Sequence, residues 1–229
     1  MPAKCWNSVR GRVMRATRVD NCGNPVIGPC SQVVTKGFVK VSYSPEIAEG
    51  EEIELRRADG QLCVSDQGCP ELKWLTVEIE FCQVDPDLFS MITGYPTVLD
   101  WQGDAVGTRI TSKVECDSGV ALEVWSDVPG APCSDGGLRQ YGYFLLPWIV
   151  NGIIGDLEIG NDATTFTLTG KTKKGGNWGV GPYMVDPTDG ASPPTAGPLL
   201  TPIGPDEHMD LHLTTVAPPE DACGCQPLA

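Results

Sequence analysis

The sequence predicts an all-β protein with one short α-helix. Of its 229 residues, 27 are glycine and 20 are proline, a composition that favours many short strands joined by turns over long helices. Apolar and polar residues alternate along much of the chain, which is the period-two pattern of half-buried strands. The length suits one large all-β domain or two small ones, and a chain of this size can bury a core of its own.

The clearest predicted strand covers residues 74–82. One of its faces would carry the apolar side chains, which are Leu75, Val77, Ile79 and Phe81, and the opposite face would carry Thr76, Glu78, Glu80 and Cys82. Similar alternation predicts further strands at residues 9–19, 33–43, 51–57, 107–116, 120–127, 163–171 and 208–216.

A hairpin is predicted near the middle of the chain. Residues 141–150 are apolar on both faces, as expected for a strand that is buried on both sides. Asn151 and Gly152 follow directly, and Asn-Gly is the dipeptide that most strongly favours a two-residue hairpin turn. We therefore expect residues 153–159 to return as the partner strand.

The predicted helix begins after residue 85. Asp85 supplies an N-cap, Pro86 suits the first helical position, and Gly94 stands where a left-handed C-terminal residue belongs. Between these ends lies an apolar stripe at helical spacing, formed by Leu88, Phe89 and Ile92. Because the helix follows the 74–82 strand almost without a linker, we expect the stripe to pack against that strand's sheet. Covering a sheet edge and contacting another subunit are compatible roles.

Two segments are predicted to be irregular. Residues 184–207 contain six prolines, and a stretch of this length without regular structure is typical of an interaction arm or of disorder. Residues 218–229 are polar and proline-bearing, so we expect a mobile C-terminal tail. Without a repeat or a domain boundary elsewhere, residues 1–217 are predicted to form a single domain.

The charge balance argues against stable nucleic-acid binding. The chain has 16 basic and 30 acidic residues, a net charge of −14, whereas affinity for phosphates comes from lysine and arginine. Residues 1–40 alone have a net charge of +6, and the remainder of the chain has a net charge of −20. A basic end and an acidic body would suit head-to-tail association between copies. Solvated strand faces explain the same distribution equally well.

Membrane and secretory signals are missing from the sequence as it stands. No stretch approaches the ~20 consecutive apolar residues of a membrane span. The first residues, Met-Pro-Ala-Lys-Cys-Trp, lack the apolar region of a secretory signal. We therefore expect synthesis in a cytoplasm and no membrane partner.

No constellation of catalytic or cofactor-binding residues is found. The sequence has no P-loop, no dinucleotide-binding glycine motif, no His-Glu-x-x-His and no Gly-x-Ser-x-Gly. Its two histidines leave little for histidine-based acid–base chemistry. Glu78 and Glu80 could in principle act as an acid and base pair. A β-sandwich glycosidase is therefore the alternative hypothesis among enzymes. The prediction is that the protein is not an enzyme and has no cofactor.

The best metal candidate combines His208 and His212 with Cys223 and Cys225. Thiolates and imidazoles are zinc ligands, but this spacing matches no standard zinc signature, so no metal is predicted. Among the ten cysteines, Cys22/Cys30 and Cys63/Cys69 bracket turn-like segments. Cytosolic synthesis makes free thiols the default, with late disulfides or a shared metal as alternatives.

Several segments taken together resemble a known family. They are Arg-Ala-Thr-Arg-Val-Asp-Asn-Cys-Gly (15–23), Val-Glu-Ile-Glu-Phe-Cys-Gln-Val-Asp-Pro-Asp-Leu-Phe-Ser-Met-Ile-Thr-Gly (77–94), Ile-Ile-Gly-Asp-Leu-Glu-Ile (153–159), Phe-Thr-Leu-Thr-Gly-Lys-Thr (166–172) and Asn-Trp-Gly-Val-Gly-Pro-Tyr (177–183). The likeness continues through residues 197–202 and 212–219. In this order the segments resemble the major tail (tail tube) proteins of long, non-contractile-tailed bacteriophages, especially those that infect actinobacteria.

The resemblance implies a fold, an assembly and a location. The fold would be a β-sandwich or partly closed barrel with one flanking helix. Hexameric rings would stack into a tube in the virion, between the tail terminator and the tip, with the tape measure and distal tail proteins as further partners. DNA would pass through the lumen without specific binding. The family has no catalytic residues, so none are assigned.

Two surface hypotheses follow from the resemblance and the charge pattern. The first places Thr76, Glu78 and Glu80 on the lumen wall, where carboxylates would repel the phosphates of passing DNA. The second places Arg10, Arg12 and Arg18, predicted to share one strand face, against an acidic surface of a neighbouring ring.

Other classes of protein remain open. One is the tube protein of a contractile tail or of a tail-like secretion system. Another is a soluble β-sandwich that binds carbohydrate or protein. Tube proteins assemble into rings or filaments when concentrated, whereas a binding module stays monomeric.

Overall fold

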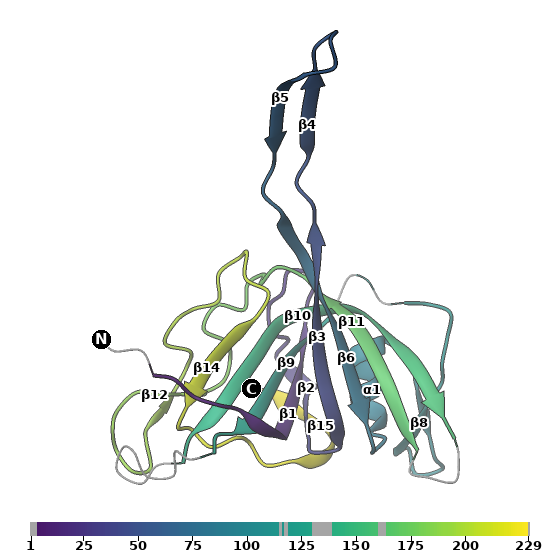
Figure 1. Cartoon of the computed structure of the whole chain (residues 1–229). Helices are drawn as coiled ribbons and strands as arrows, with labels where there is room; N and C mark the ends of the chain where they lie inside the picture. The colour runs from purple at the N-terminus through teal and green to yellow at the C-terminus, as the bar shows by residue number, and fades with distance from the viewer. Residues whose placement is uncertain (1–3, 115, 117–118, 130–138, 160–163, 229) are drawn as a thin grey trace.

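A computed structural model describes residues 4–114, 116, 119–129, 139–159 and 164–228 (Figure 1). The main strands are β1 (Val9–Val19), β2 (Gly28–Thr35), β3 (Phe38–Ala48), β6 (Glu71–Phe81), β9 (Gly119–Asp127), β10 (Tyr141–Glu158), β11 (Thr165–Thr172), β14 (Asp210–Thr214) and β15 (Ala222–Leu228). They form one antiparallel sheet in the order β15-β2-β1-β9-β10-β11-β6-β3, and β14 pairs with β10 outside this path. The predicted all-β class with one short helix is confirmed.

Three short strand pairs lie outside the large sheet in the described part of the chain. They are β4 (Glu52–Arg56) with β5 (Leu62–Gln67), β7 (Thr97–Leu99) with β8 (Ala105–Thr108), and β12 (Asp186–Pro187) with β13 (Ala196–Gly197). The 107–116 strand predicted from the sequence is therefore wrong, because β8 ends at Thr108 and residues 109–114 are irregular. Residue 115 lies outside the described residues.

The large sheet curls around a core, as in a partly closed barrel. The edge strand β3 approaches β1 so closely that a Cβ atom on Gly11 would lie 2.5 Å from the Phe38 ring. The core that the curled sheet encloses contains apolar side chains from the inward faces of β1, β6, β9, β10 and β11. An aromatic cluster fills one part of it, with ring centroids 5.8 Å apart for Phe81 and Phe166 and 4.8 Å apart for Phe89 and Phe166.

Helix α1 (Pro86–Thr93) closes this core from inside the curl (Figure 1). The Asp85 side chain accepts hydrogen bonds from the backbone N–H groups of Asp87 and Leu88, at 3.0 and 3.2 Å, and so caps the helix. Gly94 ends it with a left-handed φ of 72°. The apolar stripe of the helix, formed by Leu88, Phe89 and Ile92, is buried in the core.

The opposite face of β1, β9 and β10 is covered by residues 175–207. Trp178, Val185, Leu199 and Ile203 from this segment form a second core with buried residues of the sheet, which include Trp125, Tyr143 and Leu145. The proline-rich stretch 184–207 is irregular apart from β12 and β13, as its sequence suggests. It is packed on the sheet, however, and is neither a projecting arm nor disordered.

The Asn151–Gly152 hairpin prediction is wrong. Strand β10 runs uninterrupted from Tyr141 to Glu158, and its register with β11 shifts between Val150 and Ile153. The dipeptide therefore forms a β-bulge, with Asn151 at φ 57°. Gly152 lies directly against the backbone of Ile92 in α1, where any Cβ atom would collide.

Two further predictions need correction, one of a strand and one of a mobile tail. The stretch 33–43 is not one strand, because β2 ends at Thr35 and β3 begins at Phe38; the Gly37 N–H donates to the Thr35 hydroxyl at the turn. Within the segment 218–229, which is expected to be a mobile tail, residues 222–228 instead form β15, which pairs with β2 and is joined to it by the Cys30–Cys225 disulfide. Residue 229 lies outside the described residues.

Candidate functional site

A hairpin arm, residues 50–69, projects from the body of the protein. Strands β3 and β6 leave the sheet together and continue as β4 and β5, which extend far from the body (Figure 1). All side chains of β4 and β5 are exposed. Among the described residues, no side chain of these two strands is therefore buried against the body.

The hairpin arm is amphipathic. Ile53 pairs with Asp66 and Leu55 pairs with Val64, so Ile53, Leu55 and Val64 share one face. These three side chains are 52%, 58% and 47% exposed. The opposite face has Glu52 across from Gln67 and Glu54 across from Ser65. An isolated two-stranded ribbon is marginally stable in water, and an exposed apolar patch of this kind usually marks an interaction surface.

A polar sheet face lies at the base of the same ribbon. Thr76, Glu78 and Glu80 of β6 all point away from the core, and Val77, Ile79 and Phe81 point into it. Neighbouring strands add hydroxyl groups to this face, because Glu78 lies between Ser42 of β3 and Thr169 of β11.

Lysines modify the acidic character predicted for this face. Lys40 pairs with Glu80, and Lys171 pairs with Thr76, so both belong to the polar sheet face. The Lys171 ammonium also lies 4.4 Å from the centroid of the Trp74 ring. The face is consequently rich in hydroxyl groups and close to neutral rather than strongly acidic.

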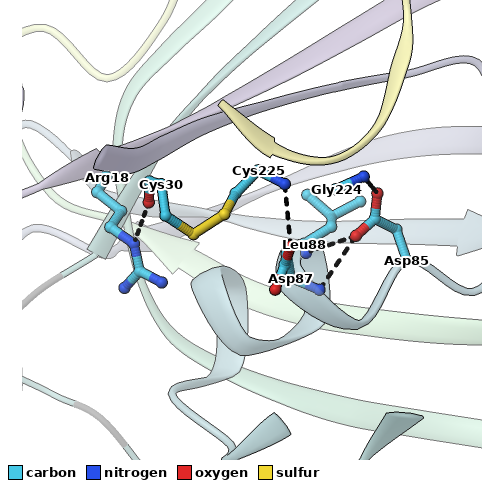
Figure 2. The surroundings of a disulfide bond; sticks show 7 residues. All are labelled: Arg18, Cys30, Asp85, Asp87, Leu88, Gly224 and Cys225. Atoms are coloured by element: carbon cyan, nitrogen blue, oxygen red, sulfur yellow. Dashed lines mark hydrogen bonds between the residues drawn. A yellow bond between two sulfur atoms is a disulfide. The ribbon is translucent and has the colours of Figure 1, made fainter. Parts of the chain in front are cut away.

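The three arginines assigned to one basic face do not share it. Strand β1 has register shifts on both sides of Gly11, and Arg10 has a φ of 55°. Arg12 pairs with Asp127 at 3.2 Å and lies over the Tyr141 ring, near the second core. Arg18 instead donates to the Cys30 carbonyl on the disulfide side of the sheet (Figure 2). The bulges break the two-residue period on which the prediction relied.

A buried ion pair, missed in the sequence, fixes the covering segment to the sheet. Arg15 of β1 donates two hydrogen bonds to Glu123 of β9, at 2.5 and 2.6 Å, and Tyr143 donates a third at 2.6 Å. The Arg15 guanidinium also lies 3.2 Å from the centroid of the Tyr183 ring. Burial opposes the charge on Arg15, but the contact with Glu123 outweighs it and raises the pKa of Arg15. Burial, followed by the Glu123 charge, raises the pKa of Tyr143.

The histidine and cysteine cluster considered for zinc does not form. His212 is held between two carboxylates, with Nδ1 2.7 Å from Asp210 and Nε2 2.9 Å from Asp186. Burial opposes its protonation, but these two carboxylates raise the pKa of His212 to about 9. With both ring nitrogens occupied, His212 has no lone pair for a metal. Cys225 is in a disulfide, and Cys223 is exposed.

The disulfide joins the C-terminal strand β15 to β2, close to the start of the helix (Figure 2). Cys30 of β2 is bonded to Cys225 of β15. The backbone N–H groups of Gly224 and Cys225 donate to Asp85 and Asp87, each at 3.0 Å. These carboxylates therefore hold the end of the chain as well as the N-terminus of α1.

Most of the other cysteines are free thiols. Cys30 does not pair with Cys22, and Cys63 does not pair with Cys69. The free cysteines of the described residues, all exposed, are Cys5, Cys22, Cys63, Cys69, Cys82, Cys116 and Cys223. Cys30, Cys225 and Asp87 do place two sulfurs and a carboxylate oxygen within 4.8 Å of one another, but the sulfurs are bonded together. Cys133 lies outside the described residues.

Comparisons with known proteins add no relative. A scan against protein-family models found no match, and a search of curated proteins found no similar sequence. Within the described residues, the eight-residue helix α1 is far too short to cross a bilayer, and no other helix is a candidate for a membrane span.

Proposed function

We propose that this protein is a structural subunit of a bacteriophage tail tube, assembled from copies of itself, and that it is not an enzyme. The observation that supports the proposal best is the hairpin arm. It presents Ile53, Leu55 and Val64 to solvent on a ribbon that no other described part of the chain covers. The apolar surface of such an arm is removed from water only when another molecule covers it.

A second copy of the chain is the partner that fits a repeating assembly. The arm and the surface that receives it are different parts of one subunit, so the contact is heterologous. Contacts of this type generate closed rings or open filaments, and never stop at a symmetric dimer. Hexameric rings stacked into a tube, as the sequence resemblance implies, are one such arrangement. Tail terminator, tape measure and distal tail proteins would then contact the tube at its ends and in its lumen.

The polar sheet face supports a role for the tube in passing DNA. Its serine and threonine hydroxyl groups, together with Glu78 and Glu80, present no cluster of cations to hold phosphates. Lys40 and Lys171 are each flanked by polar or acidic neighbours on this face. A chain with a net charge of −14 likewise has little nonspecific affinity for DNA. We therefore assign Thr76, Glu78 and Glu80 to the lumen wall of the proposed tube.

Polar substitution on the apolar face of the arm tests the proposal. Wild-type protein is expected to sediment as large assemblies when concentrated and to form hollow tubes in negative-stain electron microscopy. Replacing both apolar residues of β4, in Ile53→Ser/Leu55→Ser, should leave a folded monomer. The matched control, Glu52→Gln/Glu54→Gln, changes the opposite face of the same strand and should assemble like wild type.

Two results would count against the proposal. If wild-type protein stays monomeric at every concentration, the arm serves a different partner, as in a soluble protein-binding sandwich. If the double serine variant forms tubes as readily as wild type, the arm is not what holds the subunits together. Circular dichroism spectra that match wild type establish that the variants are folded.

A further inference from the structure

A single tryptophan lies at the tip of the β7–β8 hairpin, well away from the arm. Trp101 is 89% exposed. The turn that presents it is fixed by Asp100, whose carboxylate accepts from the N–H groups of Gln102 and Asp104, at 2.8 and 3.0 Å. A backbone hydrogen bond of 2.9 Å from Asp100 to Asp104 closes the turn. The indole is therefore displayed on an ordered support, which lowers the entropy cost of binding through it.

A cavity of about 190 Å³ lies elsewhere, in the seam where β3 approaches β1, β9 and β10. Its apolar lining includes Phe38, Tyr43, Val124 and Phe144. Ser8 and Lys40 lie at the polar part of the lining. Lys40 is exposed and makes no ion pair with any described residue. We call this cavity the β3 seam pocket.

The tryptophan tip and the β3 seam pocket match in size. An apolar cavity of roughly 150 Å³ accommodates a benzene molecule. The seam pocket, at about 190 Å³ and open to solvent, has room for the larger indole ring. Its aromatic lining suits edge-to-face and offset contacts with an inserted ring.

The two surfaces also match in charge. Trp101 directly follows Asp100 and lies three residues before Asp104. The Asp104 side chain is exposed and has no ion-pair partner among the described residues. Lys40 is in the lining of the pocket and, on the edge strand β3, also lies across from Glu80. An acidic aromatic tip and a basic aromatic pocket are complementary, and a lysine beside an indole adds a cation–π attraction.

We propose that Trp101 of one copy inserts into the β3 seam pocket of a second copy of this chain, with Asp104 facing Lys40 of the receiving copy. This inference rests on the proposed self-assembly and names one of its contacts. Tip and pocket are separate surfaces of the same subunit, so the contact is heterologous and can repeat around a ring. It is also distinct from the contact made by the hairpin arm.

The test is a charge exchange combined with removal of the indole. The measured quantity is the protein concentration at which half of the material sediments as assemblies. Trp101→Ala should raise it by about tenfold or more, because buried tryptophans are typical interface hot spots. Lys40→Glu and Asp104→Lys should each raise it. The double variant Lys40→Glu/Asp104→Lys should return to within about threefold of wild type, since the exchanged charges attract again.

An exposed apolar residue elsewhere provides the control. Ile27→Ser removes a side chain that is exposed on the loop before β2, and assembly should be unchanged. Urea midpoints equal to that of wild type show that each variant is folded. Assembly of Trp101→Ala at the wild-type concentration, or a double charge variant no better than the weaker single variant, would overturn the inference.

The outcomes separate this inference from the proposed function. If wild-type protein forms tubes and Trp101→Ala forms them equally well, the tryptophan contact is wrong and the tube proposal stands. If wild-type protein and every variant stay monomeric, both are wrong.

Discussion

One continuous ribbon of this protein has a buried base and an exposed tip. At the base, β3 and β6 pack into the first core, where Val77 is 1% and Ile79 is 4% exposed. At the tip, β4 and β5 have the same alternation of apolar and polar side chains, yet Ile53 and Leu55 are more than half exposed. The pattern along the strands is the same, and only the presence of a covering layer differs.

An alternating pattern therefore specifies a strand and its apolar face but not the partner that covers this face. At the base, the partner is α1 and the curled sheet of the same chain. At the tip, the part of the chain that the structure describes provides no partner, so the apolar face is available for another molecule. In the proposed function that molecule is a second copy.

The largest expected effect comes from breaking a buried charge in the body. Arg15→Met leaves the Glu123 carboxylate buried without its partner, which typically costs about 3–5 kcal/mol of stability. Arg56→Met removes an exposed guanidinium of the arm, 3.4 Å from Glu54, and should cost at most about 1 kcal/mol. Urea denaturation of both variants measures the difference. Equal costs would mean that the arm is as tightly integrated as the body.

A smaller effect is expected when one isoleucine is truncated at each end of the ribbon. Ile79→Ala opens a cavity in the first core and should cost about 2–5 kcal/mol. Ile53→Ala at the tip should change the stability of the monomer by no more than about 0.5 kcal/mol. Denaturation at a concentration below assembly gives both values. A large loss for Ile53→Ala would show that the arm is already packed within the subunit.

The smallest effect concerns pH and the segment that covers the second core. The pKa of His212 is raised from 6.5 to about 9 in the folded protein, so its two carboxylate contacts favour the folded state fully below pH 6.5. That contribution is lost as the pH rises through about 9. The stability gap between wild type and His212→Gln should therefore shrink between pH 6.5 and pH 10.

The other histidine serves as the control for that titration. Burial, together with the Lys174 charge, lowers the pKa of His208, so its folded form is already neutral at neutral pH. The gap between wild type and His208→Gln should stay constant between pH 8 and pH 10. A His212→Gln gap that is equally constant would contradict the charged His212 contact.

Much of the fold follows from local patterns in the sequence. The 74–82 strand and the helix capped by Asp85 and Gly94 are where the pattern places them, because alternation and capping depend on neighbouring residues alone. The Asn151–Gly152 hairpin prediction is wrong because it, too, depends on neighbouring residues alone. The dipeptide favours positive φ, and the choice between a hairpin and a bulge depends on the distant strand β11 and on Ile92.

Features that depend on distant contacts could not be predicted. The 218–229 segment looks like a mobile tail because nothing nearby in sequence reveals the open edge of β2 or the bond from Cys30 to Cys225. Likewise, Arg15 differs from the arginines around it only in facing Glu123, which is 108 residues away. For the hairpin arm, the sequence pattern predicts only a strand at 51–57, since a local pattern cannot show that a strand lies outside the body.

Electron cryomicroscopy of the concentrated wild-type protein shows whether the subunits assemble into a tube and what the hairpin arm contacts. The expected result is stacked rings around an open lumen, with Glu78 and Glu80 facing that lumen and the Ile53–Leu55 face of each hairpin arm buried against another copy. A uniform population of monomers with the arm free in solution would contradict it, as would a tube in which the arms contact nothing.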